Sequence, residues 1–251
     1  MAQPQSPLLP AYILHSRPYS DSSLILELLT PEHGRIGCVA RGARRDKQRR
    51  QQALQPFSPL LVTLMGRGEL KTLGPVESAG SSHWLRGRAV YGGLYVNELL
   101  VRMLPVAEAQ YQVFAAYQDL LGDLNALGGE DSNELLAPLR RFELRLLGEL
   151  GNCPSLDYCA GTRGPLDKSG RYRLVRETGF IPVHRGEGAA ARVDEFTGAE
   201  LLGLHSVLQG EHFSPEFLGA AKRLTGLLLG PLLGEKPLRS RELFRQVYGK
   251  Q

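Results

Sequence analysis

Residues 57–77 read Phe-Ser-Pro-Leu-Leu-Val-Thr-Leu-Met-Gly-Arg-Gly-Glu-Leu-Lys-Thr-Leu-Gly-Pro-Val-Glu, and this stretch decides the fold. Two runs of mostly apolar and β-branched residues, 57–65 and 69–77, flank Gly66-Arg67-Gly68. A three-residue connection with glycine is typical of a β-hairpin, because glycine adopts the positive φ angles that such turns need. The stretch therefore predicts two antiparallel strands.

Three more short strands are predicted on the N-terminal side of this hairpin, at residues 11–15, 23–30 and 35–41. Turn clusters separate them, Arg-Pro-Tyr-Ser-Asp at 17–21 and Pro-Glu-His-Gly at 31–34, in which proline fixes φ and the small polar side chains bond their own backbone. Five short strands in one small module are most economically closed into a barrel. The OB-fold is the leading candidate for residues 1–80.

The pattern changes from strand to helix at about residue 81. Apolar residues then recur three and four apart, which is the period of an α-helix. The predicted helices are residues 86–104, 108–121, 132–150, 197–207, 214–233 and 240–248. The fold class is therefore α+β: an OB-fold domain at 1–80 and a mostly helical domain at 81–251, with a small irregular insertion at about 152–192.

A basic loop follows the third predicted strand. Residues 41–50 contain six cations and one anion; the cations are Arg41, Arg44, Arg45, Lys47, Arg49 and Arg50. Such a run is either a solvated loop or a surface that grips phosphates, since clustered Lys and Arg release counterions when they meet a nucleic-acid backbone. The N-terminal module adds further candidate DNA contacts at Arg17, Arg35, Arg67 and Lys71.

Aromatic side chains complete the candidate site, because OB-folds bind single strands by combining a basic groove with stacking platforms. Core packing is the favoured reading for Tyr12 and Phe57. Tyr19 lies in a polar turn and is the better candidate for stacking on a base. We find no recognition helix that presents base-reading side chains, so we expect binding that is largely independent of sequence.

The charges are unevenly distributed along the chain. Residues 1–80 carry ten Lys and Arg against six Asp and Glu, residues 81–221 carry thirteen against eighteen, and residues 222–251 carry seven against two. Two basic ends around an acidic middle indicate a polyanionic partner. The first residues lack the cationic start and apolar run of a signal peptide, and no apolar run reaches the length of a membrane span. We expect a cytoplasmic, nucleoid-associated protein.

Enzymatic and metal chemistry find little support in the sequence. Cys153 and Cys159 are separated by five residues and have no second pair, whereas zinc sites usually offer two closely spaced ligand pairs. Cys38 lies in an apolar alternation and is predicted to be core. There is no Gly-x-Ser-x-Gly motif, and the scattered carboxylates do not form the acidic cluster of a two-metal nuclease. We expect no enzyme activity, no cofactor and no metal.

A second candidate surface lies on the predicted helix 132–150. Arg140, Arg141 and Arg145 beside Leu139 and Leu144 are compatible with a cationic rim around an apolar groove, which would suit an acidic, hydrophobic peptide. The alternative is an ordinary amphipathic helix with a solvated arginine face. Periodicity alone favours that alternative.

The chain resembles the RecO family of bacterial recombination and repair proteins. The similar blocks include residues 11–20, 30–35, 41–44 and 54–57, then 66–73, 95–100 and 139–144, and finally 220–223 and 236–244. They extend nearly from end to end. The set is specific, although no single block is.

The resemblance implies an N-terminal OB-fold, a helical domain and a function without bond cleavage. Family members bind single- and double-stranded DNA, anneal complementary strands and help load the RecA recombinase in the RecF pathway. Their partners are RecR and the acidic tail of the single-stranded-DNA-binding protein, SSB.

Carried over by position, residues 41–50 match the DNA-binding region, and Arg140, Arg141 and Leu144 match the helix that docks the SSB tail. Many members hold zinc with four cysteines. This chain keeps Cys153 and Cys159 and so resembles the zinc-free branch. An RNA-binding or ribosome-associated OB-fold protein is the alternative function, and a metal-dependent nuclease is a further one.

Overall fold

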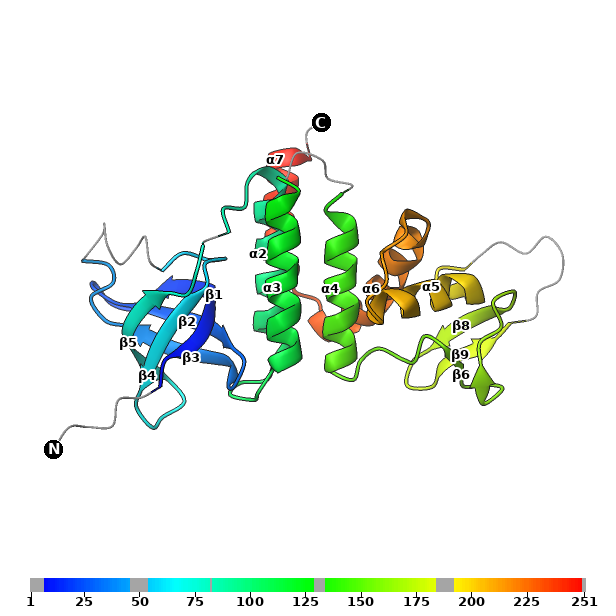
Figure 1. Ribbon diagram of the computed structural model, residues 1–251, viewed down its shortest axis with the longest axis horizontal. Helices are drawn as coiled ribbons and strands as arrows, with labels where there is room; N and C mark the ends of the chain where they lie inside the picture. The colour runs from blue at the N-terminus through cyan, green and yellow to red at the C-terminus, as the bar shows by residue number, and fades with distance from the viewer. Residues whose placement is uncertain (1–6, 46–53, 82, 129–133, 184–191, 250–251) are drawn as a thin grey trace. The chain divides into compact units, whose positions relative to one another are not determined.

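The first five strands close into a barrel. The structure is a computed structural model that describes residues 7–45, 54–81, 83–128, 134–183 and 192–249. The strands are β1 (Leu9–Pro18), β2 (Leu24–Thr30), β3 (Gly34–Ala40), β4 (Leu60–Met65) and β5 (Lys71–Ser78). Their order around the barrel is β1-β2-β3-β5-β4, with β3 and β5 parallel and the other neighbours antiparallel. The predicted OB-like barrel is confirmed (Figure 1).

Alternation of side chains builds the barrel core. Along β3, every second residue from Gly34 to Ala40 is buried, because successive side chains of a strand point to opposite faces. The inward residues of all strands form one apolar cluster that includes Cys38, as predicted. Burial raises the pKa of the Cys38 thiol to about 12, so this cysteine behaves as a small apolar residue.

Residues 11–14 of β1 are buried on both faces of the strand, where the barrel meets two helices, α2 (Gly87–Met103) and α3 (Tyr111–Ala126). The β1–β2 register shifts between Ile13 and His15. Asn97 of α2 donates to the buried carbonyl of Leu14 at 3.1 Å, and the Tyr117 hydroxyl of α3 donates to the Asn97 side-chain oxygen at 2.7 Å. Both side chains are buried, so this polar network is satisfied internally and fixes the helices on the barrel.

The C-terminal helix α7 (Arg239–Tyr248) packs along α2. Its N-terminus is capped by Glu98 of α2, whose carboxylate accepts from the backbone N–H of Arg239 at 3.1 Å and of Ser240 at 2.9 Å. Arg102 pairs with Glu98 at 2.6 Å and also donates to the carbonyl of Lys236. This arrangement satisfies two of the free N–H groups of the first turn of α7 with a side chain from another helix.

The segment before β4 is also fixed to α2. Phe57 is buried and has a φ of +67°, which is unusual for a bulky residue. Its ring lies against Gly93, where an added Cβ would stand 2.6 Å from the ring. The chain that returns from the basic loop is therefore anchored in the surface of α2.

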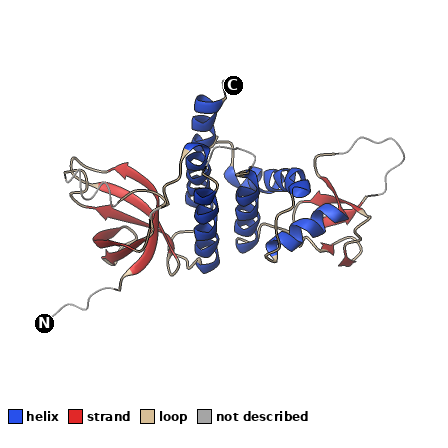
Figure 2. Cartoon of the chain, turned by 45° about the horizontal axis from the view of Figure 1, so that its top comes forward, coloured by secondary structure: helices blue, strands red, loops and turns tan. Residues whose placement is uncertain are grey.

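A second compact unit contains three helices, one 3-10 turn and a small sheet among its described residues. The helices are α4 (Leu136–Glu149), α5 (Gly198–Leu208) and α6 (Leu218–Leu233), and α6 is preceded by the 3-10 turn η1 (Pro215–Phe217). The sheet has the order β10-β8-β9-β6-β7; its strands are β6 (Tyr158–Cys159), β7 (Gly164–Pro165), β8 (Arg171–Val175), β9 (Gly179–Pro182) and β10 (Glu195–Thr197). Figure 2 shows this sheet in red. A capping box joins Thr197 and Glu200 at the start of α5.

The compact units do not follow chain order. One comprises Met1–Leu135 and Glu235–Gln251, and the other is Leu136–Gly234. The barrel thus shares a unit with α2, α3 and α7. The sequence boundary near residue 80 marks the change from strand to helix, and the division into domains at that point remains a prediction.

Candidate nucleic-acid interface

A groove of about 420 Å³ opens on the barrel between the β1–β2 turn, the end of β3 and the start of β5. Its walls mix hydroxyls, apolar groups, cations and one aromatic ring; the lining residues are Tyr19, Ser22, Ser23, Val39, Arg41, Gly42, Leu70, Lys71 and Thr72. OB-folds bind oligonucleotides beside the loops that join strands 1–2 and 4–5. The groove lies at this position and brings three predicted residues together: Tyr19, Arg41 and Lys71. We call it the barrel groove.

Tyr19 has the exposure that stacking requires. Its side chain is 60% exposed, whereas Tyr12 and Phe57 are buried, as predicted for core residues. The N–H of Tyr19 donates to the carbonyl of Ser23 at 3.0 Å, which closes the β1–β2 turn. The ring is therefore carried by an ordered turn at the groove, where a nucleobase can stack on it.

The start of the basic loop is attached to the same turn. The N–H of Arg44 donates to the carbonyl of Ser22 at 3.0 Å, and its guanidinium donates to the carbonyl of Ser20 at 2.6 Å. Ala43, the residue before Arg44, is fully buried. Arg44 thus holds the loop in place, while Arg41 and Arg45 are exposed beside it.

The β4–β5 hairpin carries Lys71, which lines the groove, and one more predicted residue, Arg67. Strand β4 ends at Met65 and β5 begins at Lys71, so the connection is longer than the predicted three residues. The ammonium of Lys71 donates to the carbonyl of Gly66 at 3.3 Å across this connection, and Arg67 at its tip is exposed. Arg17 is exposed on β1. Lys47, Arg49 and Arg50 lie outside the described residues.

Arg35 stabilises the fold, and most of its side chain is covered. Its guanidinium pairs with Glu27 at 3.2 Å and donates to the carbonyl of Leu104, at the end of α2, at 3.1 Å. Only 19% of its side chain is exposed. Arg35 therefore joins the barrel to α2, which is a poor position for a phosphate contact.

The predicted peptide site on α4 needs a correction. Leu144 is fully buried in the core of its unit, so it cannot contribute to an exposed apolar rim. Arg140 pairs with the fully buried Glu143 and donates to Thr225 of α6 at 3.1 Å, and it therefore links α4 to α6. Arg141 is half-buried and is the member of the predicted trio whose position is still compatible with a surface contact.

The two cysteines of the insertion differ in their surroundings. Burial raises the pKa of the half-buried Cys153 to about 11. Burial would also raise the pKa of Cys159, but hydrogen bonds from Thr162 and the Gly161 N–H hold it below its ordinary value. Within the described part of the chain, no group of three or more His, Cys, Asp or Glu is placed to hold a metal ion.

Sequence reasoning missed one charged and aromatic region. Trp84 is 75% exposed, and Arg88 at the start of α2 stacks on Tyr248 of α7. The signals were present in the basic C-terminal thirty residues and in the sequence His-Trp-Leu-Arg-Gly-Arg at 83–88. Only the fold shows that these two segments meet.

Comparison with known proteins decides the family. The model for the recombination protein O N-terminal domain matches residues 8–81, and that for the C-terminal domain matches residues 86–242. The chain belongs to the RecO family.

Curated relatives agree with this assignment over most of their length. The DNA repair protein RecO of Serratia proteamaculans is 45% identical over 96% of this chain and 94% of its own. RecO of Shigella boydii is 43% identical, and RecO of Escherichia coli K12 is 42% identical, each over 96% of this chain and 95% of its own. This RecO-family chain is thus a DNA repair protein. None of the helices in its described residues is long and apolar enough to cross a membrane.

Proposed function

We propose that this protein binds single- and double-stranded DNA through the barrel groove and anneals complementary strands. The observation that carries the proposal is the convergence of Tyr19, Arg41 and Lys71 on one groove. Cations there neutralise phosphates, and the exposed ring supports a base of any identity. Neutralising the phosphates of both strands lowers the repulsion that slows their pairing. No bond is cleaved, so the protein acts as a mediator and not as an enzyme.

Two classes of substitution separate the contribution of the cations from that of the aromatic ring. Both are measured by titration with a fluorescent single strand at several salt concentrations. Arg41→Ala with Lys71→Ala should weaken binding and reduce the slope of log K against log salt by about 1.4, since each lost phosphate contact on a single strand removes about 0.7. Tyr19→Ala should weaken binding by about 1–3 kcal/mol with an unchanged slope, because a lost stacking contact releases no counterions.

Arg176→Ala is the matched control, because it removes an exposed cation from the β8–β9 turn. It should leave both affinity and slope unchanged. Unchanged affinity and slope in the groove variants at low salt would contradict the proposal. Stronger binding of an RNA of the same sequence would favour the RNA-binding alternative.

We further propose that the acidic tail of SSB docks on α4 through Arg141, which concentrates the protein on coated strands. Action with RecR to help load RecA follows from the same recruitment. Arg141→Ala should weaken binding of a peptide with the SSB tail sequence and leave binding of naked DNA intact. Equal loss of both would make Arg141 a DNA contact. Arg140→Ala is unsuitable for this test, because it removes the ion pair of the buried Glu143 carboxylate.

A further inference from the structure

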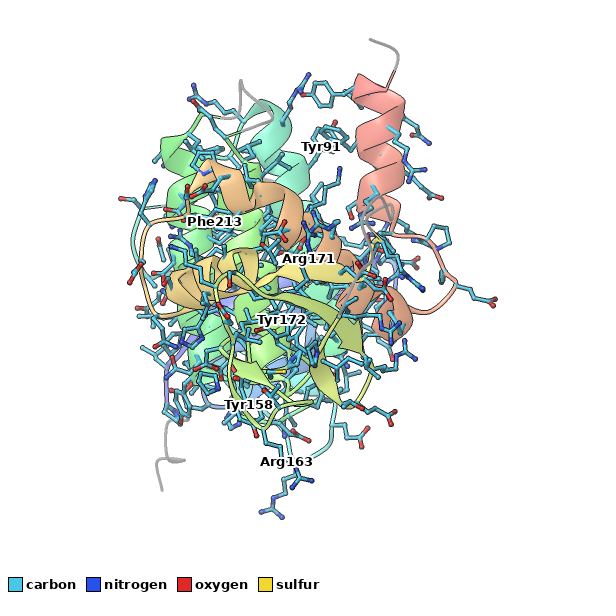
Figure 3. The ribbon with its side chains drawn as sticks, turned by 90° about the vertical axis from the view of Figure 1, so that its right-hand side faces the viewer. Tyr91, Tyr158, Arg163, Arg171, Tyr172 and Phe213 are labelled. Atoms are coloured by element: carbon cyan, nitrogen blue, oxygen red, sulfur yellow. The ribbon has the colours of Figure 1, made fainter. Side chains whose placement is uncertain are left out.

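A second cationic surface lies where α7 packs on α2. We call it the α2–α7 face; it consists of Arg88, Tyr91, Tyr95, Arg241, Arg245 and Tyr248. Arg88 lies over the ring of Tyr248 at 4.8 Å, and Arg241 lies over the ring of Tyr95 at 5.1 Å. Tyr91 packs edge-on against Tyr248 at 5.5 Å, and Figure 3 shows Tyr91 beside the C-terminal helix.

The cations of this face keep their charge available for a ligand. Among the described residues, none of the carboxylates forms an ion pair with Arg88, Arg241 or Arg245. The nearby Glu98 is already engaged by Arg102 and by the N-terminus of α7. Stacking on a tyrosine ring orients a guanidinium without neutralising it. The face therefore holds two oriented guanidiniums, Arg88 and Arg241, and the exposed Arg245, and none of the three is paired with a carboxylate of the described residues.

The arrangement on α7 concentrates these charges on one side. Arg241 and Arg245 are four residues apart and thus neighbours on the helix surface. Arg239 lies on a different strip of the α7 surface, together with Leu243 and Val247, which follow it by four and eight residues. The side chains of Leu243 and Val247 are exposed. Helix α7 thus carries two arginines, Arg241 and Arg245, on the α2–α7 face and a third, Arg239, away from it.

The α2–α7 face belongs to the same compact unit as the barrel groove. The hydrogen bonds from Asn97 to Leu14 and from Tyr117 to Asn97 fix α2 and α3 on the barrel. The Glu98 carboxylate fixes α7 on α2. Two cationic surfaces are thereby carried by one internally bonded unit.

We propose that the α2–α7 face binds the phosphate backbone of a second DNA strand while the barrel groove holds the first. This inference rests on the proposed annealing function and deepens it by assigning a separate surface to the incoming strand. Arg241 donates to the Tyr95 hydroxyl at 3.3 Å and has no carboxylate partner among the described residues. Phosphate is the ligand chemistry that guanidiniums without a carboxylate partner fit best. Because contact is to the backbone, capture of the second strand is independent of sequence. Base pairing between the two bound strands then selects the complementary strand.

The test uses the full chain in which Arg88, Arg241 and Arg245 are all changed to Gln, which keeps much of each stem and removes the charge. The protein is first bound to a short immobilised oligonucleotide, and capture of a second, non-complementary labelled oligonucleotide is then measured. Sedimentation verifies that one protein holds two strands. The triple variant should bind the first strand within twofold of the parent and the second at least tenfold more weakly, and it should anneal at least tenfold more slowly.

Arg239→Gln is the matched control, because it removes one charge from the other strip of α7; it should retain second-strand capture within twofold. Trp84 provides an independent readout. It is the single tryptophan of the chain and lies two residues before the N-cap residue of α2. Its fluorescence should be quenched when the second strand binds to the parent protein and not when it is offered to the triple variant.

Each other outcome has a distinct meaning. Unchanged second-strand capture by the triple variant would overturn this inference and leave the groove function intact. Loss of first-strand binding in the triple variant, with normal binding in the groove variants, would overturn both, because the α2–α7 face would then be the primary site. Loss of binding to an acidic peptide with normal capture of DNA would make the face a protein-docking surface, which also overturns the inference.

Discussion

Single residues anchor the described chain before and after the basic loop. Arg44 fixes the start of the loop to the β1–β2 turn, and Phe57, which follows the loop in the sequence, lies in the surface of α2 beside Gly93. The positive φ of Phe57 is unfavourable by itself. Packing against a glycine that leaves room for the ring compensates for this conformation.

Gly93→Ala should therefore destabilise the protein although alanine is the better helix former. The new Cβ would stand 2.6 Å from the Phe57 ring and 2.9 Å from Leu85, and such overpacking costs about 1–3 kcal/mol. Gly122→Ala in α3 is the matched control, because nothing lies within 4 Å of its Cβ; it should stabilise by up to about 1 kcal/mol. Urea unfolding measures both. Equal shifts of the same sign would show that the Phe57 contact is unimportant.

At the scale of elements, α7 depends on a carboxylate supplied by another helix. Burial alone would raise the pKa of Glu98, but the hydrogen bonds from Ser240 and Arg239 and the charge of Arg102 together lower it. A carboxyl with a lowered folded pKa contributes stability above its unfolded pKa of about 4.3, and that contribution is lost as pH falls through the folded value.

Glu98→Gln should accordingly destabilise the protein at pH 7 by about 1–3 kcal/mol, since hydrogen bonds to a charged group become bonds to a neutral one. The difference in unfolding free energy between parent and variant should shrink as the pH falls below about 4.3. Urea unfolding at a series of pH values measures this difference. Hydrogen exchange of the α7 amides at pH 7 shows whether the lost stability lies in α7. Glu242→Gln, on the exposed side of α7, should change stability by less than about 0.5 kcal/mol at pH 7. A constant difference across the pH series would contradict the role of Glu98.

At the scale of the whole molecule, local patterns were enough for the barrel and for most helices. Alternation along β3 and the glycines around Arg67 identify strands from neighbouring residues alone. The role of Tyr19 was also readable, because a polar turn exposes its aromatic residue. Each of these features depends on contacts that are near in sequence.

The features that sequence reasoning missed depend on distant partners. Arg35 and Arg140 look like free surface cations, yet their acceptors, the Leu104 carbonyl and the Thr225 hydroxyl, lie 69 and 85 residues away. The burial of Leu144 has no clear local signal, because a row of arginines next to leucines does not define where the core lies. The return of α7 to α2 has no local signal at all.

The return of the chain to its first unit has a consequence during synthesis on the ribosome. The segment Leu136–Gly234 is synthesised before Glu235–Gln251, so the inserted unit has all its residues before the first unit does, although it begins later in the sequence. Domains generally fold as units while the chain grows at about 5–20 residues per second. Until Arg239–Tyr248 has emerged, Glu98 lacks its α7 donors and the rings of Tyr91 and Tyr95 lack their cover. The nascent chain therefore exposes this part of α2 until α7 has been made and has packed on it.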